Sequence, residues 1–201
     1  MSAGTQMKDW FTRHGRGLGA GALVLAALAV GRVVEQRLPE PDAVGTAPIE
    51  KRTEIGDPVD LRVGTVTVTK VTGGKSWTSI SEAKLTTGVW IVADVELLPS
   101  RLKSGINDVR IRDDQGHTWF MGRGESTCTG VIAGVPMTCQ VIVEVPEQPI
   151  SGAELVLRWN PADDRWDDQA VIPLDLGEAR TKEYAAVTEP IKIPMPTLGD
   201  S

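Results

Sequence analysis

The sequence has few aromatic residues, few cysteines and few histidines. Of its 201 residues, six are tryptophan, two phenylalanine and one tyrosine, and there are two cysteines and two histidines. It also lacks a basic excess, because 21 lysines and arginines stand against 27 acidic residues for a net charge of -6. Nucleic-acid binding needs a basic face, so we exclude a nucleic-acid partner. Because the side chains present form only weak candidate sites, we predict a protein that is not an enzyme and holds no cofactor.

Recognisable catalytic and repeat patterns are absent as well. There is no internal repeat and no nucleophile elbow. The run Val71–Trp77, VTGGKSW, lacks the spacing of a phosphate-binding Walker loop. The length suits one domain with flanking segments, and a domain of that size can bury a real core.

One long apolar stretch is present, from Gly17 to Val34, and it separates a basic head from an acidic body. Residues 1–16 carry a net charge of +2, and the stretch has no charge before Arg32. Its uninterrupted part is about 22 Å long as a helix, and Arg32 near the end can extend toward the headgroups of a bilayer core of about 30 Å. The upstream cations favour a cytoplasmic N-terminus. We therefore predict a single-pass cell-membrane protein, with residues 1–16 cytoplasmic, a transmembrane signal anchor at 17–34 and an extracytoplasmic body.

Two other interpretations of the stretch stay open. A basic head, a short apolar region and Ala27-Leu28-Ala29 also fit a cleaved signal peptide, which would make the protein secreted. A buried core helix is the third, although the stretch is apolar all round and has charged flanks. The signal anchor and the cleaved signal peptide both place the body of the protein outside the cytoplasm. No cysteine lies in or beside the stretch to carry a lipid.

An exported body predicts a disulfide between Cys128 and Cys139. Gly130, Gly134 and Pro136 lie between them, which suggests a loop that leads into a strand. A zinc site would need two more ligands at suitable spacing, and His117 is the one histidine available as a base outside the membrane. Metal binding, catalysis and two free thiols remain the alternatives.

The body divides into a linker, a domain rich in strand patterns, and a tail. Residues 35–58 contain four prolines and many charges and are predicted to be an extracytoplasmic linker, and residues 177–201 a C-terminal tail that is at most partly docked. Between them, alternating apolar residues predict strands in the ranges 59–71, 88–98, 108–122 (a hairpin), 137–146, 153–159 and 169–176. In the first range the alternation changes parity at Gly64, which predicts a bulge. About seven short strands without crossover helices predict an all-β, antiparallel sandwich over residues 59–176.

Four segments occur in an order that resembles a known family: GVWIVADVEL, IRDDQGHTWF, IAGVPMTCQVIVEVPEQ and AELVLRW. It is the immunoglobulin-like extracellular domain family of Gram-positive, actinobacterial envelope proteins of unknown function, which includes the secreted immunoprotective antigen of mycobacteria. The matching features are Asp113–Gly116, Trp119 and Phe120, Gly134, and Val145-Pro146. This chain departs from the family where Ala133-Gly134-Val135-Pro136 replaces a Pro-Gly loop. The resemblance implies an immunoglobulin-like, exported sandwich and supplies no catalytic residues.

Two candidate chemical sites have structural explanations that compete with function. Asp163, Asp164, Asp167 and Asp168 form an acidic loop that could bind a cation, although it lacks the alternation and glycine of an EF-hand. His117 beside Asp113 and Asp114 could be an acid–base pair, but aspartate is also favoured at a hairpin turn for backbone reasons. We predict a solvated loop in the first case and a turn in the second.

Parity also predicts one contact surface. If Val89 and Ile91 face the core, Trp90 faces outward, and Arg110 and Arg112 do so on the next strand. Should the two strands be neighbours in one sheet, Trp90 would share an outer face with both arginines, which is the composition of an interface hot spot. The alternative is that the tail or the linker covers Trp90.

Three functions follow. The first is a non-enzymatic, membrane-anchored module that binds a protein or an envelope component. The second is an accessory subunit of a membrane transport or secretion complex, because the small residues in GLGAGAL would allow close helix packing. The third is a metal-dependent hydrolase, which would retain tightly bound metal.

Overall fold

The computed structural model describes residues 23–32, 48–80, 83–100, 105–159 and 168–199, and the chain divides into a unit at Met1–Thr46 and a unit at Ala47–Ser201. In the first unit, residues 23–32 form a helix with exposed side chains. Among the described residues, no helix has both the length and the apolar character needed to cross a bilayer. The rest of the predicted anchor, 17–22 and 33–34, lies outside the described residues, so the anchor stays a prediction.

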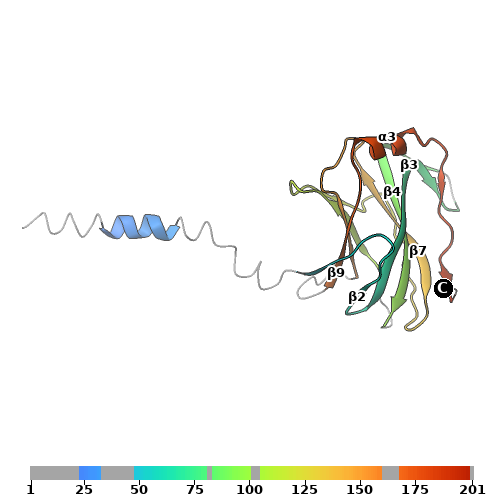
Figure 1. Ribbon diagram of the computed structural model, residues 1–201, viewed down its shortest axis with the longest axis horizontal. Coiled ribbons are helices and arrows are strands. Elements are labelled where there is room, and N and C mark those ends of the chain that lie inside the picture. The colour runs from blue at the N-terminus through green and yellow to red at the C-terminus, as the bar shows by residue number, and fades with distance from the viewer. Residues whose placement is uncertain (1–22, 33–47, 81–82, 101–104, 160–167, 200–201) are drawn as a thin grey trace, which may run out of the picture. The chain divides into compact units, whose positions relative to one another are not determined.

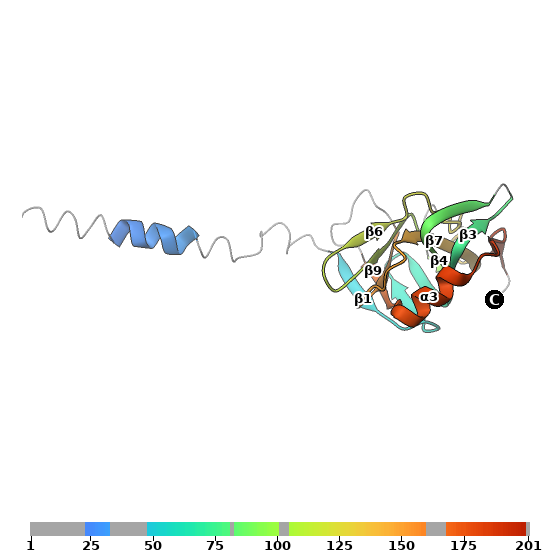
Figure 2. The ribbon, with the colours of Figure 1, turned by 90° about the horizontal axis from the view of Figure 1, so that it is seen from above.

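The second unit is a sandwich of two β-sheets (Figures 1 and 2). In the five-stranded sheet, called sheet A here, the order is β1 (Ile49–Arg52), β9 (Asp168–Pro173), β8 (Glu154–Arg158), β5 (Asp108–Arg112) and β6 (Thr118–Phe120). In the six-stranded sheet, called sheet B, the order is β10 (Ile191–Lys192), β3 (Gly64–Thr78), β4 (Lys84–Pro99), β7 (Met137–Val145) and β11 (Thr197–Leu198), with β2 (Val59–Leu61) also paired to β3. The predicted β-sandwich is therefore confirmed.

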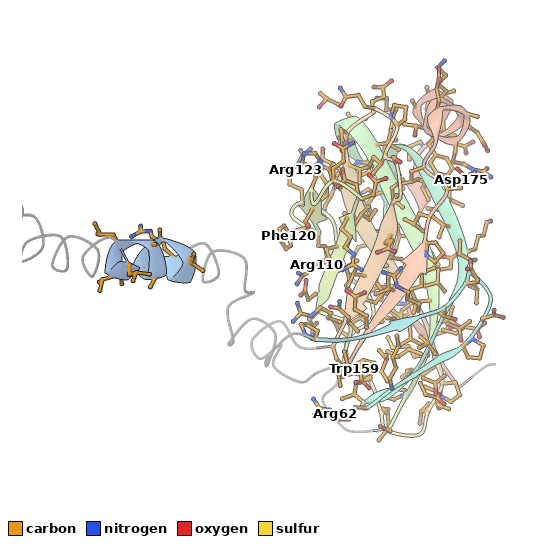
Figure 3. All side chains as sticks on the ribbon, turned by 60° about the vertical axis from the view of Figure 1, so that its left-hand side comes forward. Arg62, Arg110, Phe120, Arg123, Trp159 and Asp175 are labelled. Atoms are coloured by element: carbon orange, nitrogen blue, oxygen red, sulfur yellow. A yellow bond between two sulfur atoms is a disulfide. The ribbon has the colours of Figure 1, made fainter. Side chains whose placement is uncertain are left out.

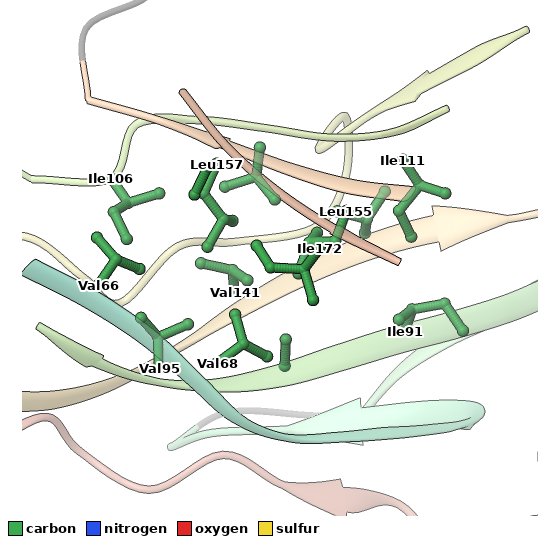
Figure 4. Packing of buried hydrophobic residues seen from close by; sticks show 14 of the residues in the cluster. Val66, Val68, Ile91, Val95, Ile106, Ile111, Val141, Leu155, Leu157 and Ile172 are labelled. Atoms are coloured by element: carbon green, nitrogen blue, oxygen red, sulfur yellow. The ribbon is translucent and has the colours of Figure 1, made fainter. Parts of the chain in front are cut away.

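Alternating apolar residues form the core, as the strand patterns predict. On β4, Val89, Ile91, Ala93 and Val95 are at most 2% exposed and face inward. The inward residues of β5, β8 and β9 meet them from sheet A (Figure 4). Because such residues recur at every second position, each strand contributes one face to the layer between the sheets.

The predicted bulge at Gly64 is wrong, because the segment turns there. Leu61 pairs with Gly64 and Val59 with Val66, so β2 and β3 form a hairpin across Arg62 and Val63. The turn changes the parity of the buried residues, as a bulge would. Gly64 has φ +153°, and a Cβ at this position would lie 2.5 Å from the backbone oxygen of Leu98.

The sandwich extends beyond both predicted boundaries. Before residue 59, β1 pairs in parallel with β9, so part of the predicted linker is a strand. After residue 176, the helix α3 (Glu178–Ala186) places Tyr184 in the main core. Gly73 allows this approach, since a Cβ there would lie 2.5 Å from Tyr184 Cδ2. Two pairings, β1 with β9 and β10 with β3, are parallel, so the sandwich is not wholly antiparallel.

Residues 187–199, called the C-terminal strap here, follow α3 and contribute to both edges of sheet B. β10 pairs with Trp77 and Thr78 of β3, and β11 pairs antiparallel with Met137 and Thr138 of β7. Between these pairings, Ile193 is buried on the outer face of the sheet. It packs in a second apolar cluster, called the strap cluster here, with Trp77, Trp90, Val92 and Ile142.

The predicted disulfide between Cys128 and Cys139 is confirmed. The two Cα atoms are 5.0 Å apart, and both side chains are fully buried in the core. Cys139 lies on β7 and faces inward. The backbone N–H of Thr127 donates to the Gln140 carbonyl over 2.8 Å. The bridge thus holds the segment before the loop against β7.

Candidate binding site at the edge of sheet A

The predicted surface of Trp90, Arg110 and Arg112 does not form, because the strands that carry these residues lie in different sheets. Trp90 is on β4 in sheet B, whereas both arginines are on β5 in sheet A. The side chain of Trp90 does face the outer side of its sheet, but it is 0% exposed and belongs to the strap cluster. The alternative, that the tail covers Trp90, is the one the structure supports.

Other residues than expected surround Trp90. Its ring meets the edge of Trp77 at a centroid distance of 6.1 Å, and the guanidinium of Arg123 lies 5.7 Å from its centroid. The indole N–H groups of Trp77 and Trp90 are buried and have no hydrogen-bond partner among the described residues. Trp90 is therefore part of a packed secondary core and is no accessible contact residue.

Arg112 belongs to a closed group of four charges on the outer face of sheet A. It donates to Glu50 over 2.6 and 3.0 Å and pairs with Glu154 at 2.7 Å. Arg52 pairs with the same two glutamates. The hydrogen bond from Arg112 holds the pKa of Glu50 below its ordinary value. Burial raises the pKa of Glu154, but hydrogen bonds from Arg52 and Arg112 outweigh this and lower it. Arg112 is thus bound within the fold and connects β1 to β5 and β8.

Arg110 lies closer to the sheet edge, beside an exposed aromatic side chain. It pairs with Asp108 on its own strand, and its guanidinium carbon lies 5.2 Å from the centroid of the Phe120 ring. Phe120 is on β6, directly opposite Arg110 in the β5–β6 pairing. Its side chain is 58% exposed. The aromatic partner of Arg110 is therefore Phe120 and not Trp90.

Phe120 is exposed because β6 is an edge strand with one inward residue. Trp119 packs against the main core, and Thr118 and Phe120 on either side of it point outward. Among the described strands, β6 pairs with β5 alone. Figure 3 shows Arg110, Phe120 and Arg123 along the same flank of the sandwich.

A hollow of about 490 Å³, called the β6 hollow here, lies beside this edge. The residues that line it come from β6 and the turn after it, and from the facing ends of β4 and β7. They are Thr87, Gly88, Thr118, Trp119, Phe120, Met121, Gly122, Arg123, Glu144, Val145 and Pro146. Both aromatic and apolar surface and one ion pair are therefore accessible in one place, which is typical of binding sites.

The ion pair of the β6 hollow joins Arg123 to Glu144. Arg123 donates to Glu144 over 2.7 and 3.2 Å, and Thr86 donates to the same carboxylate. The hydrogen bond from Arg123 lowers the pKa of Glu144 and outweighs the opposing effect of burial. The side chain of Arg123 is 66% exposed, so a ligand in the hollow can reach it.

In the turn between β5 and β6, His117 is hydrogen-bonded to Asp113, an arrangement that stabilises the turn. Asp113 accepts hydrogen bonds from the backbone N–H groups of Gln115 and His117, and from His117 Nδ1 over 2.7 Å. Burial raises the pKa of Asp113, but the bonds from His117 and Gln115 lower it below its ordinary value. Asp114 pairs instead with Ser151. These contacts support the predicted hairpin turn.

The acidic loop is described at its last residue alone. Asp168 is 2.9 Å from Lys51 Nζ and accepts from the backbone N–H of Arg62 over 2.9 Å. The predicted positions Asp163, Asp164 and Asp167 lie outside the described residues. Within the part of the chain that the structure describes, no group of three or more His, Cys, Asp or Glu side chains could hold a metal.

Phe120 and Arg123 are the residues that sequence reasoning missed. Alternation around Trp119 places Phe120 on the outer face of its strand, but it does not show that the strand lies at a sheet edge. The position of Arg123 could not be predicted either, because it depends on how the turn after β6 approaches β7.

No family model matches the sequence, and neither does any curated protein. Among solved structures, the chain is similar to an uncharacterized β-sandwich protein from Clostridium difficile, with 11% identity and a TM-score of 0.40. The likeness covers 63% of this chain and 95% of that one. The resemblance to immunoglobulin-like envelope proteins stays a prediction.

Proposed function

We propose that this protein is a non-enzymatic recognition module of the cell envelope, held at the membrane by its N-terminal segment, that binds a protein or an envelope component. The observation that carries the proposal is the exposed ring of Phe120 at a sheet edge, between Arg110 and Arg123 and beside the β6 hollow.

Phe120 and its neighbours have the composition of an interface hot spot. Aromatic residues and arginine dominate the energy of most interfaces, where they lie centrally and a surrounding rim excludes water. Burying the exposed part of a phenylalanine would contribute about 1–2 kcal/mol to binding. A ligand that covers the ring also removes water from Arg110, which strengthens its attraction to an acidic or aromatic group.

Crosslinking in cells tests the binding surface. A photoreactive amino acid at Gln115, in the turn beside β6, records the partner of the full-length chain. We expect Phe120→Ser to abolish the crosslinks and leave the melting temperature unchanged. Arg110→Ala should also abolish them, with a small fall in melting temperature because Asp108 loses one of its ion-pair partners. Arg180→Ala is the matched control, because Arg180 stacks on Tyr184 at 5.8 Å on α3, at a site that the proposal does not use. Crosslinks that persist in Phe120→Ser would refute the surface.

The tether is tested separately. The full-length chain should remain in the membrane fraction, which supports an uncleaved anchor. A mature N-terminus at Val30 in mass spectrometry would refute the anchor and favour a secreted protein. A polytopic protein that co-purifies in stoichiometric amount would favour an accessory subunit of a transport or secretion complex.

A further inference from the structure

We propose that the edge of β6 binds its partner by strand addition: an extended segment with alternating apolar and acidic residues becomes a sixth strand of sheet A. The inference rests on the proposed function and specifies how that surface recognises its ligand.

The outer edge of β6 carries backbone groups that have no partner within the described part of the chain. The N–H of Asp113 donates to the carbonyl of His117, and the N–H of Met121 donates to the carbonyl of Val109. Hydrogen-bonded and non-hydrogen-bonded pairs alternate in an antiparallel ladder, and Trp119 faces Ile111 midway between those two bonds. The N–H and C=O groups of Thr118 and Phe120 therefore point away from β5. An added strand would satisfy all four.

Side chains at this edge define what the added strand must carry. On the inner side, Trp119 and the apolar lining of the β6 hollow suit the apolar residues of the partner. On the outer side, Arg110 lies over the Phe120 ring and is paired with Asp108, and the 25% of its side chain that stays exposed can meet an acidic residue of the partner. Successive residues of a strand point to opposite sides. The partner therefore places apolar residues in the hollow and acidic residues beside Arg110.

The opposite edge of sheet A lacks these features. β1 carries Glu50, Lys51 and Arg52, and charged side chains are the usual protection of an edge against pairing with another chain. At the β6 edge, the outward residues are Thr118 and Phe120. The short length of β6 limits pairing to a few residues, so side-chain contacts in the hollow must supply the rest of the affinity.

A proline substitution distinguishes strand addition from side-chain binding. Thr118→Pro removes one outward N–H, and proline is tolerated in an edge strand when that group faces solvent. Thr118→Ala is the matched control, because it removes the same side chain and keeps the N–H. The probe is a fluorescein-labelled peptide of alternating valine and glutamate, and its binding to the full-length protein in detergent is followed by fluorescence anisotropy.

We expect Thr118→Ala to bind the peptide as the parent does and Thr118→Pro to bind about tenfold more weakly, the upper end of what one hydrogen bond contributes. Equal binding by the two variants would overturn strand addition. If Phe120→Ser still abolished that binding, the side-chain surface of the proposed function would stand. A peptide that does not bind at millimolar concentration would overturn the partner chemistry.

Amide hydrogen exchange gives a second measurement that needs no variant. Bound peptide should slow exchange at the amides of Thr118 and Phe120, because these are the groups that an added strand would bond. Protection confined to another edge, such as β1 or β11, would also overturn the proposal.

Discussion

Arg123 lies over the ring of Trp90, with 5.7 Å between the guanidinium carbon and the ring centroid, and its other side is bound to Glu144. One cation thus touches both the strap cluster and the β6 hollow. The indole is inside the fold, and the arginine is at its surface. Substitution of a buried residue of the strap cluster should therefore change stability more than substitution of an exposed residue of the β6 hollow.

Trp90→Ser should lower the free energy of unfolding by about 3–5 kcal/mol, the usual cost of truncating a large buried aromatic side chain. Phe120→Ser should change it by less than about 0.5 kcal/mol, because the Phe120 ring is mostly exposed. Urea denaturation of both variants measures the difference. A Trp90 variant as stable as the parent would show that the strap cluster contributes nothing.

Local alternation was enough to predict the strands and the side of the sheet that each residue faces. Val89, Ile91 and Val95 are buried inward as expected, and Trp90 does face the other side. Alternation cannot say which strands are neighbours, because pairing joins residues far apart in sequence. For that reason β4 and β5 were wrongly considered as neighbours, although their inward faces were right.

The short elements at the two ends of the sandwich could not be predicted from pattern. β1 has four residues, and β10 and β11 have two each, which is too few for a period to appear. Prolines around them favoured a linker and a tail. What places them is tertiary contact: Ile193 in the strap cluster and Tyr184 in the core. The Phe120 site was missed because exposure at an edge depends on the absence of a next strand.

Removing the disulfide should destabilise the fold. The double variant Cys128→Ala/Cys139→Ala should lose about 2–5 kcal/mol of unfolding free energy, because the bridge restrains the unfolded chain and both side chains are buried. Denaturation of the variant, compared with the oxidised parent, measures this. Two thiols that react with an alkylating agent in the native exported protein would contradict the bridge.

The free energy of unfolding should decrease as the pH is lowered, because Glu50 and Glu154 titrate. Both have a pKa below the ordinary value of 4.5 in the folded protein, so the folded state binds fewer protons than the unfolded state. Their contribution is fully present above that value and is lost as the pH falls through it toward the folded pKa. Urea denaturation from about pH 6 to about pH 3 should show the loss.

Glu50→Gln should make that fall in stability shallower, because it removes one of the two titrating groups that pair with Arg112. Glu178→Gln is the control, since Glu178 is 72% exposed and pairs with Lys182 on the surface of α3. High salt should reduce the difference between Glu50→Gln and the parent only in part, because the pairs are partly buried. Parallel pH curves for Glu50→Gln and the parent would contradict a role for the charge group.

The strap should be separable from the rest of the fold. Ile193 belongs to the strap cluster, whereas the main core lies between the two sheets. Ile193→Asp would bury a carboxylate among apolar groups, so we expect the strap to detach and the free energy of unfolding to drop by about 2 kcal/mol or more. Because Trp77 and Trp90 would become hydrated, tryptophan emission should shift to longer wavelength while the far-ultraviolet circular dichroism stays close to native. Met195→Asp, two residues further along the same strap at a side chain that is 70% exposed, is the control and should change neither signal. Emission that stays unchanged in Ile193→Asp would show that other contacts hold the strap on the sheet.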